Sequence, residues 1–292
     1  MSGNESMIFS LYGALSEDAE GGFSLKTLCA MLARLGLSAE ASRLALSRMA
    51  RRGFLYTKRR GKASFYFLSA AGAAIIDRAE KGSVCRDGAP AWDGRFRLVS
   101  YELPESLREE RAALAEALRQ GGFGRAAAGL WAGPFEPGAA LRERLSSPGL
   151  RGLIEEYEAV LRGDARAFAR RIFRLDERRR TLDAFLARFS ADREAFLVRR
   201  ASGRGTPDAD CFTAYFQALD AYVDAMASVP PLPPELLPQA WPAEAARELF
   251  VSYRGLVRDG AGAFYESVYE PFEPADAART KGPWPPQGGP AN

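Results

Sequence analysis

The stretch that decides the N-terminal fold is SAEASRLALSRMARRGFL, residues 38–55. Ser38 is placed to cap a helix, because its side chain can accept a backbone N–H of the first turn, and Gly53 is placed to end that helix. Helical spacing assigns four residues to a buried face and leaves Leu46 undecided: Ala41, Leu44, Ala45 and Met49. The stretch therefore predicts one helix whose opposite face carries serines and arginines.

A second helix is expected directly before this one. Ser24 is placed to cap it, apolar residues recur at three- and four-residue spacing up to Leu35, and Gly36 stops it. Two helices joined through a short glycine-containing turn form a helix-turn-helix. We also expect a first helix over residues 7–15 and a further helix over residues 70–81, which could cross a dimer interface.

A hairpin is predicted after the helix-turn-helix. Residues 54–58 and 64–68 are rich in aromatic side chains and read as strands, and a basic, glycine-containing turn separates them. A hairpin with a basic tip at this place is a wing. Residues 1–84 are therefore predicted to form a winged helix-turn-helix domain.

Charge is distributed unevenly along the chain. Between Phe23 and Leu68 there are ten basic residues and one acid, a local charge of +9, so the rest of the chain carries −6 of the net +3. This asymmetry predicts an anionic partner, double-stranded DNA, for the N-terminal region alone. The candidate contacts lie on the polar face of the third helix and around the wing: Ser38, Ser42, Arg43, Ser47, Arg48, Arg51, Arg52, Lys58, Arg59, Arg60 and Lys62.

The middle region, residues 92–163, shows alternating strand and helix signals. We expect a strand over 95–103, a helix over 105–120, short paired strands at 123–125 and 129–133, and a helix over 139–146. In the first strand, Phe96 and Leu98 should share one face, and Val99 and Tyr101 the other. The spacing within residues 151–162 fits a helix as well as a strand, so the residues alone leave that element open.

Beyond residue 164 the pattern is helical. Segments are expected at 165–173, 177–189, 193–200, 209–228, 243–257 and 261–269, which makes an all-helical domain over 164–275. The proline-rich stretch 229–242 is predicted to be a connector, because prolines exclude both helix and central strand. Residues 82–90 read as a linker, and residues 276–292 as a disordered tail.

Several classes of function are disfavoured by composition. The chain has no histidine, which excludes Ser-His-Asp and Cys-His catalysis and histidine metal sites. Cys29, Cys85 and Cys211 are far apart and have no metal-ligand spacing. No apolar run reaches about 18 residues, and no signal-peptide layout is present at the N-terminus. We therefore expect a cytoplasmic protein without membrane contact, enzymatic activity, metal or tightly bound cofactor.

Six separate stretches carry a resemblance to the PaaX family of regulators, named for repressors of phenylacetate degradation. They are SRLALSRMARRGFL (42–55), ASFYFLSAAG (63–72), WDGRFRLVSYELPE (92–105), GFGRAAAGLWAGP (122–134), RTLDAFLARF (180–189) and PPLPPELLPQAWPAEAARELF (230–250). Their order and spacing make the resemblance specific, and it covers the chain from about Phe9 to Tyr269.

The resemblance implies an α+β multidomain homodimer that binds an operator and represses a catabolic operon. It implies a winged helix-turn-helix, a ferredoxin-like middle domain and a helical C-terminal domain, and it favours a strand over residues 151–162. It further implies release by an acyl-CoA thioester such as phenylacetyl-CoA. The middle domain is also similar to small CRISPR-associated nucleases, which bind a metal through an aspartate; the matching position here is Glu102, which argues against that chemistry.

A CoA-like effector brings phosphates and an adenine, so its pocket should offer arginines beside aromatic surface. The candidates are Trp131, Arg170, Arg171, Arg178 and Arg179. The alternative assigns Trp131 to packing and the arginines to a solvated surface paired with Asp176 and Glu177.

Two other functional readings remain open from the sequence. One is an enzyme that processes nucleic acid or a thioester and is docked by the winged helix. The other is a winged helix that serves only protein contacts, which the basic excess disfavours.

Overall fold

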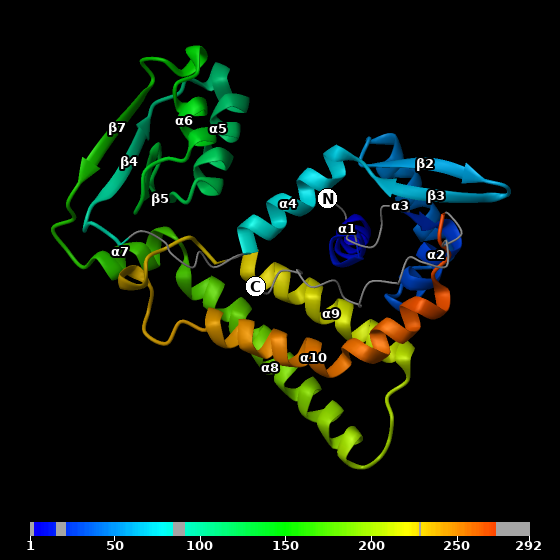
Figure 1. Ribbon diagram of the computed structural model, residues 1–292. Coiled ribbons are helices and arrows are strands. Elements are labelled where there is room, and N and C mark those ends of the chain that lie inside the picture. Colours follow the sequence, from blue (N-terminus) through cyan, green and yellow to red (C-terminus); the bar gives the residue numbers. More distant parts are fainter. Residues whose placement is uncertain (1–2, 16–21, 84–90, 228, 273–292) are drawn as a thin grey trace. The chain divides into compact units, whose positions relative to one another are not determined.

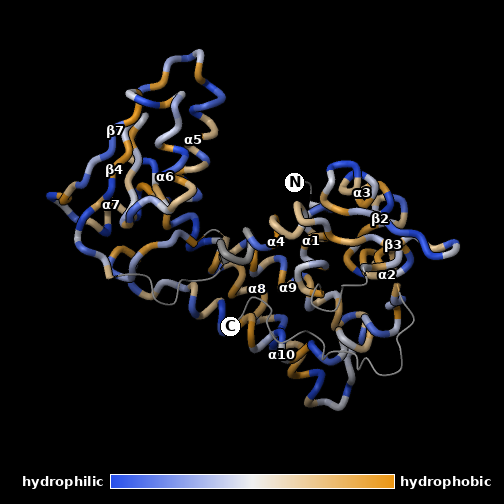
Figure 2. Tube along the Cα trace, turned by 45° about the horizontal axis from the view of Figure 1, so that its top comes forward, coloured by the Kyte–Doolittle hydropathy of each residue, from blue (hydrophilic) through white to orange (hydrophobic). Residues whose placement is uncertain are grey.

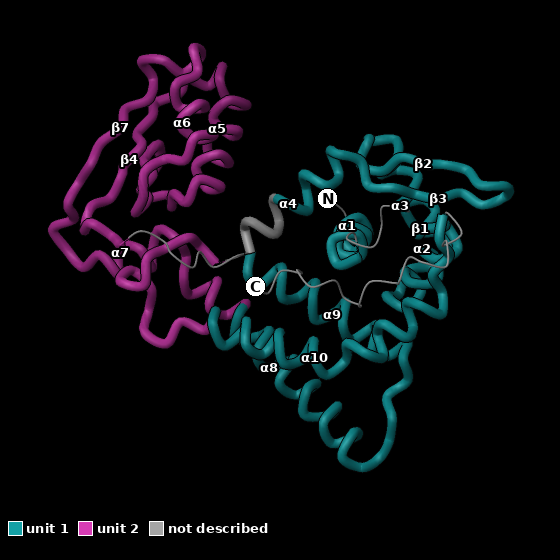
Figure 3. Tube along the Cα trace, viewed as in Figure 1, with its two compact units in different colours: residues 1–84, 182–227, 243–292 teal, residues 85–181, 228–242 magenta. Residues whose placement is uncertain are grey.

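The structure, a computed structural model, describes residues 3–15, 22–83, 91–227 and 229–272 (Figure 1). It is α+β, with helices and two small antiparallel sheets. Its contacts form two compact units, coloured in Figure 3: residues 1–84, 182–227 and 243–292 make up unit 1, and residues 85–181 and 228–242 make up unit 2. The predicted tail 276–292 and residues 84–90 of the predicted linker lie outside the described residues.

The N-terminal part of unit 1 contains four helices and a three-stranded sheet. In chain order they are α1 (Gly3–Leu15), β1 (Phe23–Ser24), α2 (Leu25–Arg34), α3 (Ala39–Arg51), β2 (Leu55–Arg60), β3 (Ala63–Leu68) and α4 (Ala70–Ser83). The strand order is β1-β3-β2, and both pairings are antiparallel. The predicted helices and hairpin are present, whereas the two-residue strand β1 was not anticipated.

The predicted caps of α2 and α3 are confirmed. The side-chain oxygens of Ser24 and Ser38 each accept the backbone N–H three residues on, over 3.0 and 3.1 Å. Both helices end where a glycine takes a positive φ, 91° at Gly36 and 77° at Gly53. Such a backbone is favoured by glycine because it lacks a Cβ. Local chemistry therefore fixes the limits of both helices.

Three long helices complete unit 1: α8 (Leu175–Ala201), α9 (Asp208–Ala227) and α10 (Ala243–Val268). The first residues of α8, up to Thr181, belong to unit 2. The predicted breaks at residues 190–192 and 258–260 were wrong, because α8 and α10 each run through them. Gly260 does not interrupt α10. A Cβ there would lie 2.7 Å from the Cys211 sulfur, so this glycine permits close approach to α9.

Helices α9 and α10 pack along each other and carry the N-terminal elements (Figure 1). The rings of Tyr222 and Phe250 stack with centroids 4.2 Å apart. On the N-terminal side, Phe23 meets Tyr265 edge-on at 6.5 Å. Unit 1 therefore has one core to which N-terminal and C-terminal residues both contribute. The first predicted domain and most of the third share this unit, and the division of the chain into three domains stays a prediction.

Unit 2 contains a four-stranded sheet with two helices in the order β-α-β-β-α-β. Its elements are β4 (Phe96–Tyr101), η2 (Glu105–Leu107), α5 (Arg108–Gln120), β5 (Gly124–Ala127), β6 (Leu130–Gly133), α6 (Ala139–Leu145), η3 (Pro148–Leu150), β7 (Ile154–Ala159), α7 (Ala165–Ile172) and η4 (Pro234–Leu236). The strand order is β5-β6-β4-β7 and all pairs are antiparallel. This is the ferredoxin-like order, and the strand expected within residues 151–162 is confirmed.

The sheet of unit 2 has an apolar core on each face, as the alternation in β4 predicts. Val99 belongs to a buried cluster with Leu114 and Leu141 of the flanking helices. Phe96 belongs to the opposite cluster, with Ile172 of α7. The proline-rich connector adds Leu232 and Leu236 to the second cluster. Residues 229–242 are therefore an ordered part of unit 2.

Replacing Gly129 by Ala should destabilise unit 2. Gly129 has φ 68°, and a Cβ would lie 2.4 Å from the backbone oxygen of Tyr101. We expect a loss of about 1 to 3 kcal/mol, typical of a strained left-handed residue, measured as a shift of the urea unfolding midpoint. Gly149→Ala is the matched control, because its Cβ would meet no atom within 4 Å. Equal midpoints for the two variants would contradict the strain argument.

Candidate nucleic-acid interface

The outer face of α3 carries free polar groups. Arg43, Ser47, Arg48 and Arg51 are all exposed, and none of their side chains makes a hydrogen bond or ion pair with another described residue. Because α3 presents these donors without a competing partner, they are available to an anion in solution.

Two residues of α3, Ser42 and Leu44, depart from the predicted faces, and the structure decides the place of Leu46. Ser42 was assigned to the outer face but is fully buried, and its hydroxyl donates to the Ser38 carbonyl over 2.9 Å. Leu44 was assigned inward but is 49% exposed, whereas Leu46 is buried. The buried stripe runs 42, 45, 46 and 49, which is the regular helical spacing. Ser38 is exposed and serves as the cap.

The β2–β3 hairpin adds four cations. Arg59 and Lys62 are exposed at its tip, where the chain is strongly hydrophilic (Figure 2). The Lys58 ammonium lies 5.0 Å from the centroid of the Phe67 ring, and Arg60 donates to backbone carbonyls of the chain end that follows α10. None of the four cations forms an ion pair with a described carboxylate.

The other three basic residues of the stretch 23–68 are paired with acids from outside it. Lys26 bonds Glu270 at 2.6 Å, and Arg34 bonds Asp210 at 2.7 Å. Arg52, a predicted contact residue, places Nη1 2.9 Å from both carboxylate oxygens of Glu5 and its guanidinium 4.7 Å from the Phe54 ring centroid. Carboxylates thereby neutralise these three cations and leave seven on α3 and the hairpin.

Glu5 is the partner that the sequence did not reveal. It lies in the first turn of α1 and is 5% exposed. A buried carboxylate requires a cation and hydrogen bonds, and Arg52 supplies both from 47 residues away. Arg52 therefore stabilises the buried Glu5 carboxylate, a role that its position in an arginine-rich run does not indicate.

The predicted effector residues do not line one pocket. Trp131 is 2% exposed within the cluster that contains Val99, and its indole N–H donates to the Tyr101 hydroxyl over 3.2 Å. The arginines belong to α7 and the start of α8, and α7 packs on the opposite face of the sheet through Ala169 and Ile172. The sheet therefore separates Trp131 from them.

The four predicted arginines mainly hold backbone and helix ends. Arg171 donates to the Ala126 carbonyl at 3.1 Å, Arg178 to that of Phe173 at 2.6 Å, and Arg179 to that of Gln239 at 3.4 Å. Arg170 pairs with Asp176 at 2.8 Å. Burial, with the neighbouring Arg174, lowers the pKa of Arg178.

Unit 1 contains a cavity of about 510 Å³ among α2, α8, α9 and α10. Its wall includes Arg34, Phe196, Arg199 and Gln217, and Tyr253 also lines it. Tyr253 is 1% exposed, its hydroxyl makes no hydrogen bond with another described residue, and burial raises its pKa to about 12. The cavity thus combines guanidinium groups, rings and a hydroxyl that is free to bond.

Other chemical sites find little support in the described part of the chain. It contains no group of three acidic, cysteine or histidine residues placed to hold a metal ion, and Glu102 is an exposed residue after β4. Burial, with Asp208 and Asp210, raises the pKa of the Cys211 thiol, which is the opposite of nucleophile activation. No described helix is long and apolar enough to span a bilayer.

Comparison with known proteins covers most of the chain. Residues 3–72 match the family described as PaaX-like protein, residues 89–167 match the PaaX protein central Cas2-like domain, and residues 173–267 match the PaaX-like protein C-terminal domain. The transcriptional repressor PaaX of Escherichia coli is 31% identical over 267 residues, which are 89% of this chain and 82% of that protein. The chain belongs to the PaaX family.

A solved structure supports the fold of this PaaX-family chain. The uncharacterized protein Rv0674 from Mycobacterium tuberculosis is 21% identical, with a TM-score of 0.61 over 87% of this chain and 96% of that one. The Cas2-like match coincides with the β4–β7 sheet of unit 2. The three family matches and the Escherichia coli relative confirm the sequence resemblance to the PaaX family.

Arg52→Ala should destabilise unit 1, whereas Arg51→Ala should not. Removing Arg52 takes two 2.9 Å hydrogen bonds from its guanidinium away from the buried Glu5 carboxylate, at a cost of about 1.5 to 3 kcal/mol. Arg51 is exposed without an ion pair to a described residue, so its loss should cost less than about 0.5 kcal/mol. Chemical unfolding of both variants measures the difference. Equal stabilities would show that the pair with Glu5 contributes nothing.

Proposed function

We propose that this PaaX-family chain is a DNA-binding transcriptional regulator and that residues 1–84 form a winged helix-turn-helix. In this arrangement α2 and α3 are the helix-turn-helix, α3 is the recognition helix, and the β2–β3 hairpin is the wing. The observation that carries the proposal is the sorting of charge. Within residues 23–68, the cations that meet no described carboxylate all lie on α3 and the hairpin: Arg43, Arg48, Arg51, Lys58, Arg59, Arg60 and Lys62.

Each group on α3 and the wing has a role in this proposal. Arg43, Ser47, Arg48 and Arg51 would enter the major groove and contact base edges and phosphates. The wing would lie beside the backbone, where each neutralised phosphate releases counterions. Ser42 is withdrawn from this set because it is buried, and Arg52 because Glu5 holds it.

We further propose that the chain acts in the cytoplasm as a homodimeric repressor of a catabolic operon, released by an acyl-CoA thioester such as phenylacetyl-CoA. The name of the Escherichia coli relative, a transcriptional repressor, supports repression. For the effector, the cavity beside Tyr253 offers Arg199 for phosphates and Phe196 for an apolar group, while Arg34 in its wall is paired with Asp210. Its volume falls in the range of about 300–1,000 Å³ usual for small-molecule sites.

The enzyme alternative has less support. No histidine is available as a general base, and the raised pKa of Cys211 keeps its thiol protonated at neutral pH. Cys85 lies outside the described residues. A protein-contact role for the winged helix gives no reason for seven unneutralised cations on two adjacent elements.

The double variant Arg48→Ala/Arg51→Ala should bind DNA more weakly without unfolding. Promoter DNA from upstream of the chain's own coding sequence is titrated by fluorescence anisotropy over a series of salt concentrations, with scrambled DNA beside it. Two lost phosphate contacts reduce the slope of log affinity against log salt by about 1.8. Arg193→Ala/Arg200→Ala removes the same charge from exposed sites on α8 and should retain the slope. An unchanged slope in the first variant would sink the recognition-helix assignment.

Phenylacetyl-CoA should release the specific DNA complex, and Tyr253→Phe should weaken that release. The substitution removes only a hydroxyl without a hydrogen bond to a described residue, so DNA affinity and stability should not change. A lost hydrogen bond to the ligand would raise the thioester concentration needed by roughly tenfold. Free CoA and phenylacetate are the controls. Identical release curves for Tyr253→Phe and the unaltered protein would exclude the cavity as the effector site.

A further inference from the structure

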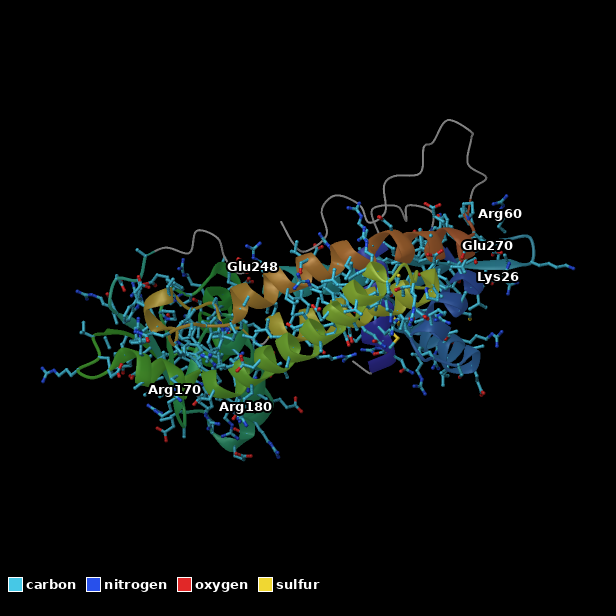
Figure 4. The ribbon with its side chains drawn as sticks, turned by 90° about the horizontal axis from the view of Figure 1, so that it is seen from below. Lys26, Arg60, Arg170, Arg180, Glu248 and Glu270 are labelled. Carbon is cyan, nitrogen blue, oxygen red and sulfur yellow. The ribbon has the colours of Figure 1, made fainter. Side chains whose placement is uncertain are left out.

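The last described residues, 268–272, fold back from the end of α10 onto the N-terminal elements; we call them the C-terminal clamp. On α2, Thr27 Oγ1 donates to the Val268 carbonyl at 2.8 Å and accepts the Glu270 N–H at 3.1 Å. The Glu270 carboxylate accepts from Lys26 Nζ at 2.6 Å and from Ser24 Oγ at 2.9 Å. Figure 4 shows Lys26, Glu270 and Arg60 gathered at one end of unit 1.

The clamp also covers the hairpin. The Phe272 ring meets Phe65 and Phe67 edge-on, with centroids 5.1 and 5.3 Å apart, and both of these strand residues are buried. Arg60 Nη1 donates to the carbonyl of Phe272 at 2.5 Å and to that of Pro271 at 3.3 Å. The segment 268–272 therefore joins α2 to both strands of the hairpin.

The partners of the hairpin cations are uncharged. Arg60 is held by carbonyls, and the Lys58 ammonium lies 5.0 and 5.8 Å from the Phe67 and Phe272 ring centroids. Lys26, by contrast, is paired with a carboxylate. Lys58 and Arg60 thus keep their full charge while their side chains are ordered. A guanidinium has five donors, so Arg60 keeps others for a phosphate.

We propose that the C-terminal clamp positions Lys58 and Arg60 for DNA phosphates, with Phe272 and Glu270 as its positioning residues. Fixing a long basic side chain costs rotamer entropy. When the fold has already ordered that side chain, binding no longer bears this cost. The proposal rests on the proposed DNA-binding function and adds that the end of α10 sets the affinity of the hairpin.

The test compares Glu270→Gln and Phe272→Ala with Glu248→Gln in the full chain, using the same promoter DNA and salt series. Glu270→Gln and Glu248→Gln each remove one negative charge. Glu248 is the control because it lies near the start of α10, at the opposite end of that helix from the clamp, as Figure 4 shows. Phe272→Ala should bind several-fold more weakly, with a salt slope reduced by about 1 to 2. In Glu270→Gln the released Lys26 returns one cation, so the slope should fall by less. Glu248→Gln should match the unaltered protein.

Thr27→Val provides a second clamp variant that changes no charge. It removes both hydrogen bonds to the clamp at a fully buried position while keeping the side-chain shape. The salt slope reports how many phosphates each bound protein neutralises. Unfolding of part of the protein lowers the amount that binds but does not by itself lower this slope. A reduced slope in Thr27→Val and in Phe272→Ala supports positioning.

Other outcomes overturn the proposal in distinguishable ways. Tighter DNA binding by the clamp variants would show that the clamp shields the hairpin, and an unchanged slope would show that it does not order the two cations. Both results leave the DNA-binding function intact. Absence of specific binding by the unaltered protein would overturn the proposed function, and the clamp proposal with it.

Discussion

Aromatic packing between α9 and α10 is the interaction on which unit 1 depends. Tyr222 stacks on Phe250, and Phe212, near the start of α9, packs on Phe264, near the end of α10, with ring centroids 4.8 Å apart. The four N-terminal helices form a small segment, and a small segment buries a smaller share of its apolar surface by itself. They complete their core on this helix pair, where Phe23 reaches Tyr265. The positions of α3 and the hairpin, which form the candidate interface, therefore depend on the packing of α9 and α10.

That shared core also explains which cations remain unneutralised. The acids that pair with Lys26, Arg34 and Arg52 come from Glu270, Asp210 and Glu5, all outside the basic stretch. Each of these pairs lies where the stretch meets another part of unit 1. The other cations meet no described carboxylate, and Lys58 and Arg60 contact the clamp only through rings and carbonyls. The packing of the N-terminal elements therefore selects the surface that an anion can use.

The sequence predicted those features that depend on neighbouring residues. Ser24 and Ser38 cap their helices as expected, and the alternation of Phe96 and Val99 gives the two faces of the unit 2 sheet. Features that depend on distant residues were missed. The expected break at residues 258–260 was wrong, because Gly260 stands in α10 where it approaches Cys211, a residue far off in sequence. Likewise, the pairing of Arg52 with Glu5 has no local signal, and the last strand of unit 2 needed the family resemblance.

The continuity of α10 gives the two proposals a common physical element. Tyr253 lines the cavity, and the clamp begins at Val268, 15 residues later on the same helix, or about 22 Å along its axis. A helix transmits displacement along its axis better than a loop, because its backbone hydrogen bonds resist bending. A ligand that changes how Tyr253 packs would therefore act on the residues that hold Lys58 and Arg60. Since coupling between two binding sites is reciprocal, DNA held by the hairpin would change the affinity of the cavity by the same factor.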